Sequence, residues 1–173
     1  TNIRKINGSV DLESEPGKGS QIIIKLPLTI AIIQALMVEV ERSIFAIPLS
    51  TVIEAVRISR SEIKTINGRE VLHLRDRVLP LIRLAQEFDI PTDANRERFY
   101  VVVAALGDRR VGVVVDELRS QEEVVIKSIW DYLETVKGVS GATITGEGKV
   151  VLILDTSELV QNAQAWHNPG IAA

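Results

Sequence analysis

The side chains that could do chemistry in this sequence are few and widely spaced. The chain has two histidines, His73 within an expected strand and His167 near the C-terminal end, and neither has a second ligand at metal-site spacing. A nucleophilic triad needs a histidine base beside an orienting acid, and the sequence suggests no such set. We therefore predict structural roles for both histidines, with no catalytic residue and no metal site.

Carboxylates and glycine-rich turns are the other groups that could serve a reaction. The acids at expected strand ends and turns are Asp116, Glu117, Glu122, Glu123 and Asp155. Acids at such positions commonly serve solubility and capping, so we do not interpret them as acid–base pairs. The turns at 17–20, 107–109 and 146–148 complete neither a Walker loop nor a dinucleotide fingerprint. We expect no cofactor, and we expect the latter two turns to close hairpins.

Composition narrows the class of protein. A chain of 173 residues suits one ordinary domain or two small ones, and its 46% apolar residues are enough for a core. Only 4% are aromatic, so that core must be aliphatic. The absence of cysteine excludes disulfides and thiolate metal sites and fits a reducing cytoplasm. The net charge of −3 attracts a polyanion weakly, and no stretch is apolar enough to predict a transmembrane span.

An internal repeat is the most informative feature of the chain. Residues 36–84 and 99–155 each contain two short apolar strands joined by a charged turn, then an acid-containing segment, then a second strand pair. Alternation of apolar and charged residues along these strands is typical of half-buried β-structure. The repeat predicts a mainly all-β fold of two small barrels in tandem, the first at about 35–88 and the second at about 99–155.

Helices and a connector are expected between and after these strands. Residues 84–88 favour one helical turn, and residues 129–136 favour a short helix. The polar, proline-containing segment 89–98 is typical of a connector between two halves.

A C-terminal helix is predicted at about 156–166. Asp155 is a suitable N-cap, with Glu158 three residues later as its capping-box partner. Leu159, Ala163 and Trp166 recur at helical spacing. We expect this face to pack across both barrels and lock them together.

The N-terminal residues differ from the repeat. Strands are expected at 9–15 and 21–26, joined by a proline–glycine turn and ended by Pro27. An isolated hairpin is only marginally stable in water, so this one needs a sheet to join. The chain also starts at Thr1 rather than at a methionine. Both features favour a fragment of a larger protein.

Residues 7–28 (NGSVDLESEPGKGSQIIIKLPL) resemble the end of the ATP-binding domain of sensor histidine kinases. That domain typically closes with a glycine, a strand, an ES-x-x-G-x-G-[ST] turn and a strand ending in Leu-Pro. The following LPLTIAII (26–33) runs directly into the repeat and resembles the chemotaxis histidine kinase family CheA. Further matches are FAIPL (45–49), VLPL (78–81), VVVD (113–116), VIK (125–127) and GATI (141–144).

This resemblance implies a fold and a function. Residues 29–173 would form a CheW-like regulatory domain of two five-stranded SH3-like β-barrels, and residues 1–28 the C-terminal hairpin remnant of the ATP-binding domain. The nucleotide-binding boxes of that domain would lie upstream, so the chain itself would neither bind nor hydrolyse ATP, although the parent kinase would use ATP and Mg. The domain would couple the kinase to a CheW-type adaptor and to the cytoplasmic tip of chemoreceptors, without nucleic acid or direct membrane contact.

Five aliphatic side chains of the first barrel are the candidate adaptor-binding residues. They are Ile53, Val56, Ile58, Leu72 and Leu74. Their strands, at 52–58 and 70–74, are apolar on both faces, whereas one small barrel buries only one face of each strand. The alternative that all five belong to the core stays open. Residues 28–33 are the expected hinge between kinase and regulatory domain.

Three other classes of protein fit the sequence less well. A free-standing CheW-like scaffold adaptor is disfavoured by the kinase hairpin, and an active ATPase or kinase fragment by the missing nucleotide motifs. A tandem-barrel nucleic-acid-binding module usually has aromatic residues interleaved with basic ones, and no strand here has that pattern.

Overall fold

The chain forms two separate units. The computed structural model describes residues 9–15, 17, 19–25, 32–126 and 136–165. Contacts divide it into residues 1–31 and 32–173, close to the predicted boundary at residue 28. In the first unit β1 (Ser9–Glu15) and β2 (Gly19–Lys25) pair antiparallel, as the sequence predicted. Leu12 lies opposite Ile22 in that hairpin, and both side chains are exposed.

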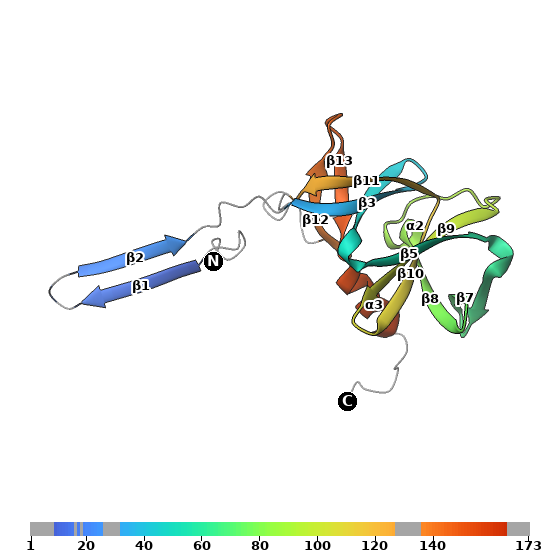
Figure 1. The fold of residues 1–173 in the computed structure, drawn as a ribbon, viewed down its shortest axis with the longest axis horizontal. Coiled ribbons are helices and arrows are strands. Elements are labelled where there is room, and N and C mark those ends of the chain that lie inside the picture. The colour runs from blue at the N-terminus through green and yellow to red at the C-terminus, as the bar shows by residue number, and fades with distance from the viewer. Residues whose placement is uncertain (1–8, 16, 18, 26–31, 127–135, 166–173) are drawn as a thin grey trace. The chain divides into compact units, whose positions relative to one another are not determined.

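The second unit contains a six-stranded and a five-stranded sheet, with the orders β5-β9-β10-β8-β7-β6 and β11-β3-β4-β13-β12 (Figure 1). The first comprises β5 (Val52–Ser59), β6 (Ile63–Ile66), β7 (Arg69–Leu74), β8 (Arg77–Arg83), β9 (Arg98–Leu106) and β10 (Arg109–Val115). The second comprises β3 (Ile32–Val40), β4 (Ser43–Pro48), β11 (Glu117–Val125), β12 (Val139–Ile144) and β13 (Val150–Leu154). The helices are η1 (Leu49–Thr51), η2 (Arg60–Glu62), α2 (Leu84–Glu87) and α3 (Thr156–Ala165).

The predicted fold class, mainly β, is confirmed, but the predicted division into consecutive barrels is wrong. Hairpin β3–β4 of the first repeat pairs with β11 and β13 of the second repeat. Hairpin β9–β10 of the second repeat pairs with β5 and β8 of the first. Figure 1 shows β3 and β11 side by side although they are far apart in sequence. Each sheet therefore combines strands from both predicted barrels, 35–88 and 99–155.

The two sheets repeat one pairing pattern, which confirms that the sequence repeat is structural. Along β5-β9-β10-β8-β7 the contacts are antiparallel, antiparallel, parallel and antiparallel. Along β11-β3-β4-β13-β12 they follow the same succession. Each repeat therefore contributes its first hairpin to the sheet that the other repeat completes.

Burial explains this exchange of hairpins. On β9, Val101 and Val103 face a cluster inside the six-stranded sheet, whereas Val102 faces a cluster shared by both sheets. On β3, Met37 faces a cluster inside the five-stranded sheet, whereas Val38 faces the shared one. A strand that is apolar on both faces is most stable when both faces are covered, because this removes the most apolar surface from water. The first hairpin of each repeat accordingly occupies the centre of the molecule.

Helix α3 closes the shared cluster, as predicted. Leu159, Val160 and Ala163 are buried there with side chains from both sheets, and Trp166 lies outside the described residues. Asp155 is the N-cap, because its Oδ1 accepts from the amides of Ser157 and Glu158 at 2.9 and 3.0 Å.

The capping-box role predicted for Glu158 is wrong. Its carboxylate accepts at 2.8 Å from the backbone amide of Gly138, and the amide of Asp155 donates to the Gly138 carbonyl. Tertiary contacts with the segment before β12 have replaced the local reciprocal bond.

Other local expectations have mixed outcomes. The helical turn expected at 84–88 is confirmed as α2, while the helix expected at 129–136 lies almost wholly outside the described residues. Of the expected hinge at 28–33, only residues 32 and 33 are described. Within the described part of the chain, no helix is long and apolar enough to cross a bilayer.

Candidate interaction sites on the two sheets

The described residues contain no cluster of three or more histidine, cysteine, aspartate or glutamate side chains suited to a metal ion. His73 is exposed on β7, and His167 lies outside the described residues. Asp116 accepts from the amide of Glu41 at 2.7 Å, and Asp155 caps a helix. These two carboxylates are therefore structural.

Two further carboxylates have perturbed acidity through local contacts. The backbone amide and hydroxyl of Ser59 donate to Glu62 at 2.7 and 2.8 Å and lower the pKa of that carboxyl. The hydrogen bond and charge of Lys149 lower the pKa of Glu147. The lowered pKa favours the ionised form of Glu62 at the end of η2 and of Glu147 in its turn, which does not suit a general base at neutral pH.

One end of the six-stranded sheet opens into a small apolar mouth. This hollow of about 190 Å³ lies where β5 starts, β7 turns into β8 and β9 ends against β10. Its lining residues are Glu54, Leu74, Arg75, Asp76, Arg77, Leu79, Val103 and Arg110. Leu79 and Val103 belong to the core inside the sheet, and Leu74 packs against it. The floor of the mouth is therefore formed by the buried residues Leu79 and Val103, with the half-buried Leu74 beside them.

The charged rim of the mouth is conformationally strained. Arg75 is the first residue of the two-residue turn between β7 and β8 and has φ +54°. A non-glycine residue pays roughly 1 kcal/mol or more for this left-handed conformation. Its guanidinium forms an ion pair with Glu54 on β5 at 2.9 Å. This arrangement keeps charged side chains around an apolar floor, as at the edge of a protein interface.

The five predicted adaptor-binding residues do not share one environment. Ile58 and Leu72 are buried in the core of the six-stranded sheet, with exposed fractions of 5% and 2%. Val56 and Leu74 are half-buried against that core, and Leu74 lines the mouth. Ile53 is exposed at 44% and adjoins Glu54 of the rim. The structure therefore places Ile53 and Leu74 at an accessible surface, and Ile58 and Leu72 away from one.

The rim was not singled out from the sequence. Its three arginines do not form a group in the sequence, because Arg75 lies in the turn before β8, Arg77 in β8 and Arg110 in β10. Only the parallel pairing of β8 with β10 brings them to one opening.

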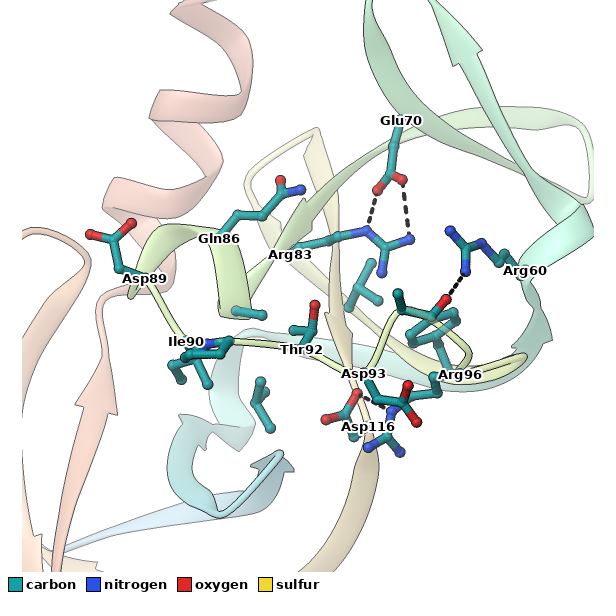
Figure 2. A pocket seen from close by; sticks show the side chains of 16 residues that line it. Arg60, Glu70, Arg83, Gln86, Asp89, Ile90, Thr92, Asp93, Arg96 and Asp116 are labelled. Atoms are coloured by element: carbon teal, nitrogen blue, oxygen red, sulfur yellow. Dashed lines mark hydrogen bonds and ion pairs between the residues drawn. The ribbon is translucent and has the colours of Figure 1, made fainter.

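A larger hollow of about 560 Å³ lies between the end of the six-stranded sheet and the segment that connects β8 to β9. Figure 2 shows Arg83 directed at Glu70, with which it forms two bonds of 2.6 and 3.1 Å. Its guanidinium also stacks 4.8 Å from the ring centroid of Phe99. Within this hollow Arg83 pairs with Glu70 and Arg96 pairs with Asp116, so these four groups are directed at one another.

Comparison with known proteins is consistent with a binding module. The family description "CheW-like domain" matches residues 34–164. The chain belongs to the CheW-like domain family. Within that family it is homologous to the CheW-like region of CheA proteins. It is 48% identical over 167 residues to the sensor histidine kinase CheAY of Helicobacter pylori and 40% identical over 163 residues to the chemotaxis protein CheA of Treponema pallidum.

These matches also cover the N-terminal hairpin. The alignment with the Helicobacter protein spans 95% of this chain, which is more than the CheW-like region alone. The chain spans about a fifth of the length of these relatives, 21% and 20%. Among solved structures, the scaffolding protein TtCheW from Thermoanaerobacter tengcongensis superimposes with a TM-score of 0.62 at 17% identity. That match covers 72% of this chain and 90% of TtCheW, and supports the fold.

Proposed function

We propose that residues 29–173 form the regulatory domain of a cytoplasmic chemotaxis histidine kinase. The domain holds the kinase to a CheW-type adaptor and to the cytoplasmic tip of chemoreceptors, and has no catalytic activity itself. The observation that carries this proposal is the mouth of the six-stranded sheet, an apolar floor inside a charged rim on a CheW-like fold. The hairpin of β1 and β2 would be the last piece of the ATP-binding domain, and the parent kinase would use ATP and Mg.

The size of the mouth indicates how a partner is held. A hollow of about 190 Å³ accommodates one large aliphatic or aromatic side chain. A single buried anchor of this kind typically contributes at least about 2 kcal/mol to binding, which is more than tenfold in affinity. We expect the adaptor to insert one such side chain against Leu79 and Val103, while its polar residues meet the rim. Ile53 would lie under the adaptor at the edge of this contact.

A free-standing adaptor is the other function compatible with the fold. The hairpin of β1 and β2 favours the kinase, because the match to CheA proteins extends across it. Leu12, Ile22 and Ile24 leave an apolar surface on that hairpin that suits a larger sheet.

Titration of the adaptor against single variants tests the proposal. Ile53→Asp is expected to weaken adaptor binding at least about tenfold, because a carboxylate would be desolvated at the contact. Ile66→Asp is the matched control, since Ile66 is exposed at 50% but is remote from the mouth. It lies on β6 opposite Arg69, and Leu74 is at the other end of β7. Val56 is less suitable, because it packs against the core and a change there would unsettle the fold.

Calorimetry with the purified adaptor would measure both variants. Equal affinity of wild-type protein and Ile53→Asp, with both folded, would remove the surface around Ile53 from the adaptor interface. Absence of any binding by the wild-type chain would contradict the proposed function itself.

A further inference from the structure

The segment between β8 and β9 is held across the gap between the two sheets. We name residues 89–97 the strap. It follows α2 and runs along the hollow of about 560 Å³, where Ile90, Thr92 and Asp93 lie in succession (Figure 2). The guanidinium of Arg60 in η2 donates to the carbonyl of Ala94, and the backbone amide of Arg60 donates to the carbonyl of Glu97 at 2.9 Å. These contacts attach the strap to the six-stranded sheet.

A second set of charged side chains attaches the strap to the turn between β3 and β4 of the five-stranded sheet and to the junction between β10 and β11, where the two sheets meet. Arg96 forms ion pairs with Glu41 at 3.3 Å and with Asp116 at 3.2 Å. Glu41 lies in the turn between β3 and β4, and its carboxylate also accepts from the amide of Asp93 at 3.1 Å. Asp116 in turn accepts from the amide of Glu41 at 2.7 Å. We call Glu41, Arg96 and Asp116 the clasp.

Burial makes the clasp more than a surface ion pair. The side chains of Arg96 and Glu41 are exposed at 29% and 26%, and that of Asp116 at only 9%. Exposed pairs contribute little, because water screens them and both side chains lose entropy. A shared network that is partly shielded and tied to backbone amides resists that screening.

Backbone strain at Glu41 points to the same role. Glu41 is the first residue of a two-residue turn and has φ +53°. The equivalent turn of the other sheet, between β9 and β10, has Gly107 at that place with φ +61°. Glycine adopts this conformation without a steric penalty, whereas glutamate pays roughly 1 kcal/mol or more. Of these two equivalent turns, only the one between β3 and β4 has a strained residue, and the carboxylate of that residue reaches the strap.

We propose that the clasp is a built-in coupling device that fixes the orientation of the two sheets through the strap, with Glu41 as its positioning residue. β3 ends at the clasp, and its first residue follows directly on the unit that contains the hairpin. The adaptor mouth belongs to the other sheet. If the proposed function holds, a change at the adaptor or receptor contact reaches β3 through the clasp as well as through the shared core.

Amide hydrogen exchange on the whole chain tests the clasp without reference to function. Glu41→Gly relieves the strain and removes the carboxylate, and is expected to lower protection of the Asp93 amide at least tenfold, while β9 and β10 stay protected. Glu41→Gln keeps an acceptor for that amide and should lie between Glu41→Gly and wild type. Arg42→Ala, in the same turn, is the control and should change nothing. Unchanged protection at Asp93 in Glu41→Gly, or loss spread evenly over β9 and β10, would overturn the proposal.

A second measurement on the intact kinase with adaptor and receptor tests the coupling. Glu41→Gly is expected to leave adaptor affinity within twofold of wild type and to reduce receptor-dependent control of phosphorylation several-fold. Wild-type control in this variant would refute the coupling role. A wild-type domain that fails to bind adaptor would instead refute the proposed function and leave the exchange result standing.

Discussion

Gly112 on β10 offers a sharp test of how the six-stranded sheet is packed. A Cβ added there would lie 2.6 Å from Cδ2 of Leu81, 2.7 Å from Cγ1 of Val101 and 2.9 Å from Cδ2 of Leu79. Carbon atoms pack best at about 3.5–4.0 Å, so each neighbour would have to retreat by about 1 Å. Ala46 holds the equivalent position in the five-stranded sheet. It lies opposite Ile153, just as Gly112 lies opposite Leu81. The constraint therefore comes from the neighbours of Gly112 and not from strand geometry.

The expected cost of Gly112→Ala follows from two opposing effects. Overpacking a core costs about 1–3 kcal/mol, while replacing glycine returns about 0.4–1 kcal/mol by restricting the unfolded chain. We expect a net loss of about 1–2 kcal/mol in the free energy of unfolding, measured by urea denaturation with an unchanged m-value. Gly146→Ala is the control, because no atom lies within 4 Å of its added Cβ, and it should stay within about 0.5 kcal/mol of wild type.

A double-mutant cycle with Leu81→Val identifies the collision. Shortening the nearest neighbour should reduce the cost of Gly112→Ala by about 0.5–1 kcal/mol. Strictly additive costs, or a Gly112→Ala variant as stable as wild type, would show that the inner face of this sheet is looser than the contacts indicate.

Two further changes test local contacts. Asp155→Ala should lower the free energy of unfolding by about 1 kcal/mol, because two amides at the start of α3 lose their acceptor. Asp155→Asn should cost much less. Equal unfolding free energies for the two variants would contradict the cap. Glu62 has a lowered pKa in the folded chain, so its stabilising contribution is present above the pKa of an unfolded glutamate and is lost as the pH falls through the folded value. Glu62→Gln should therefore flatten the loss of stability in acid, and an NMR titration of Glu62 that matched an unstructured glutamate would refute this.

Most strands, turns and helix starts can be predicted from the local sequence. Alternating apolar residues predict most strands, and Asp155 predicts the start of α3. The dipeptide Asn67-Gly68 is a hairpin-turn signal. It joins β6 to β7, and both residues have positive φ, at +51° and +76°. In β11 the exposed acids, including Glu122 and Glu123, mask the strand pattern.

The candidate site depended on contacts between distant residues. The sequence placed Ile53 and Ile58 in one group because β5 is apolar on both faces, but the two residues lie on opposite faces of the strand, and only the face of Ile58 packs on the core. Likewise Arg96 was part of a polar connector in the sequence, and only the fold sets it between Glu41 and Asp116.

The sequence by itself determined that this chain is a duplicated, aliphatic β-protein with a hairpin before it, because periodicity and turn chemistry act over a few residues. The tertiary structure alone decided which hairpin joins which sheet. That choice depends on covering strands that are apolar on both faces, such as β3 and β9, and covering them requires side chains contributed by both repeats. The accessible mouth and the clasp follow from that exchange, since each is assembled from segments that are distant in the chain.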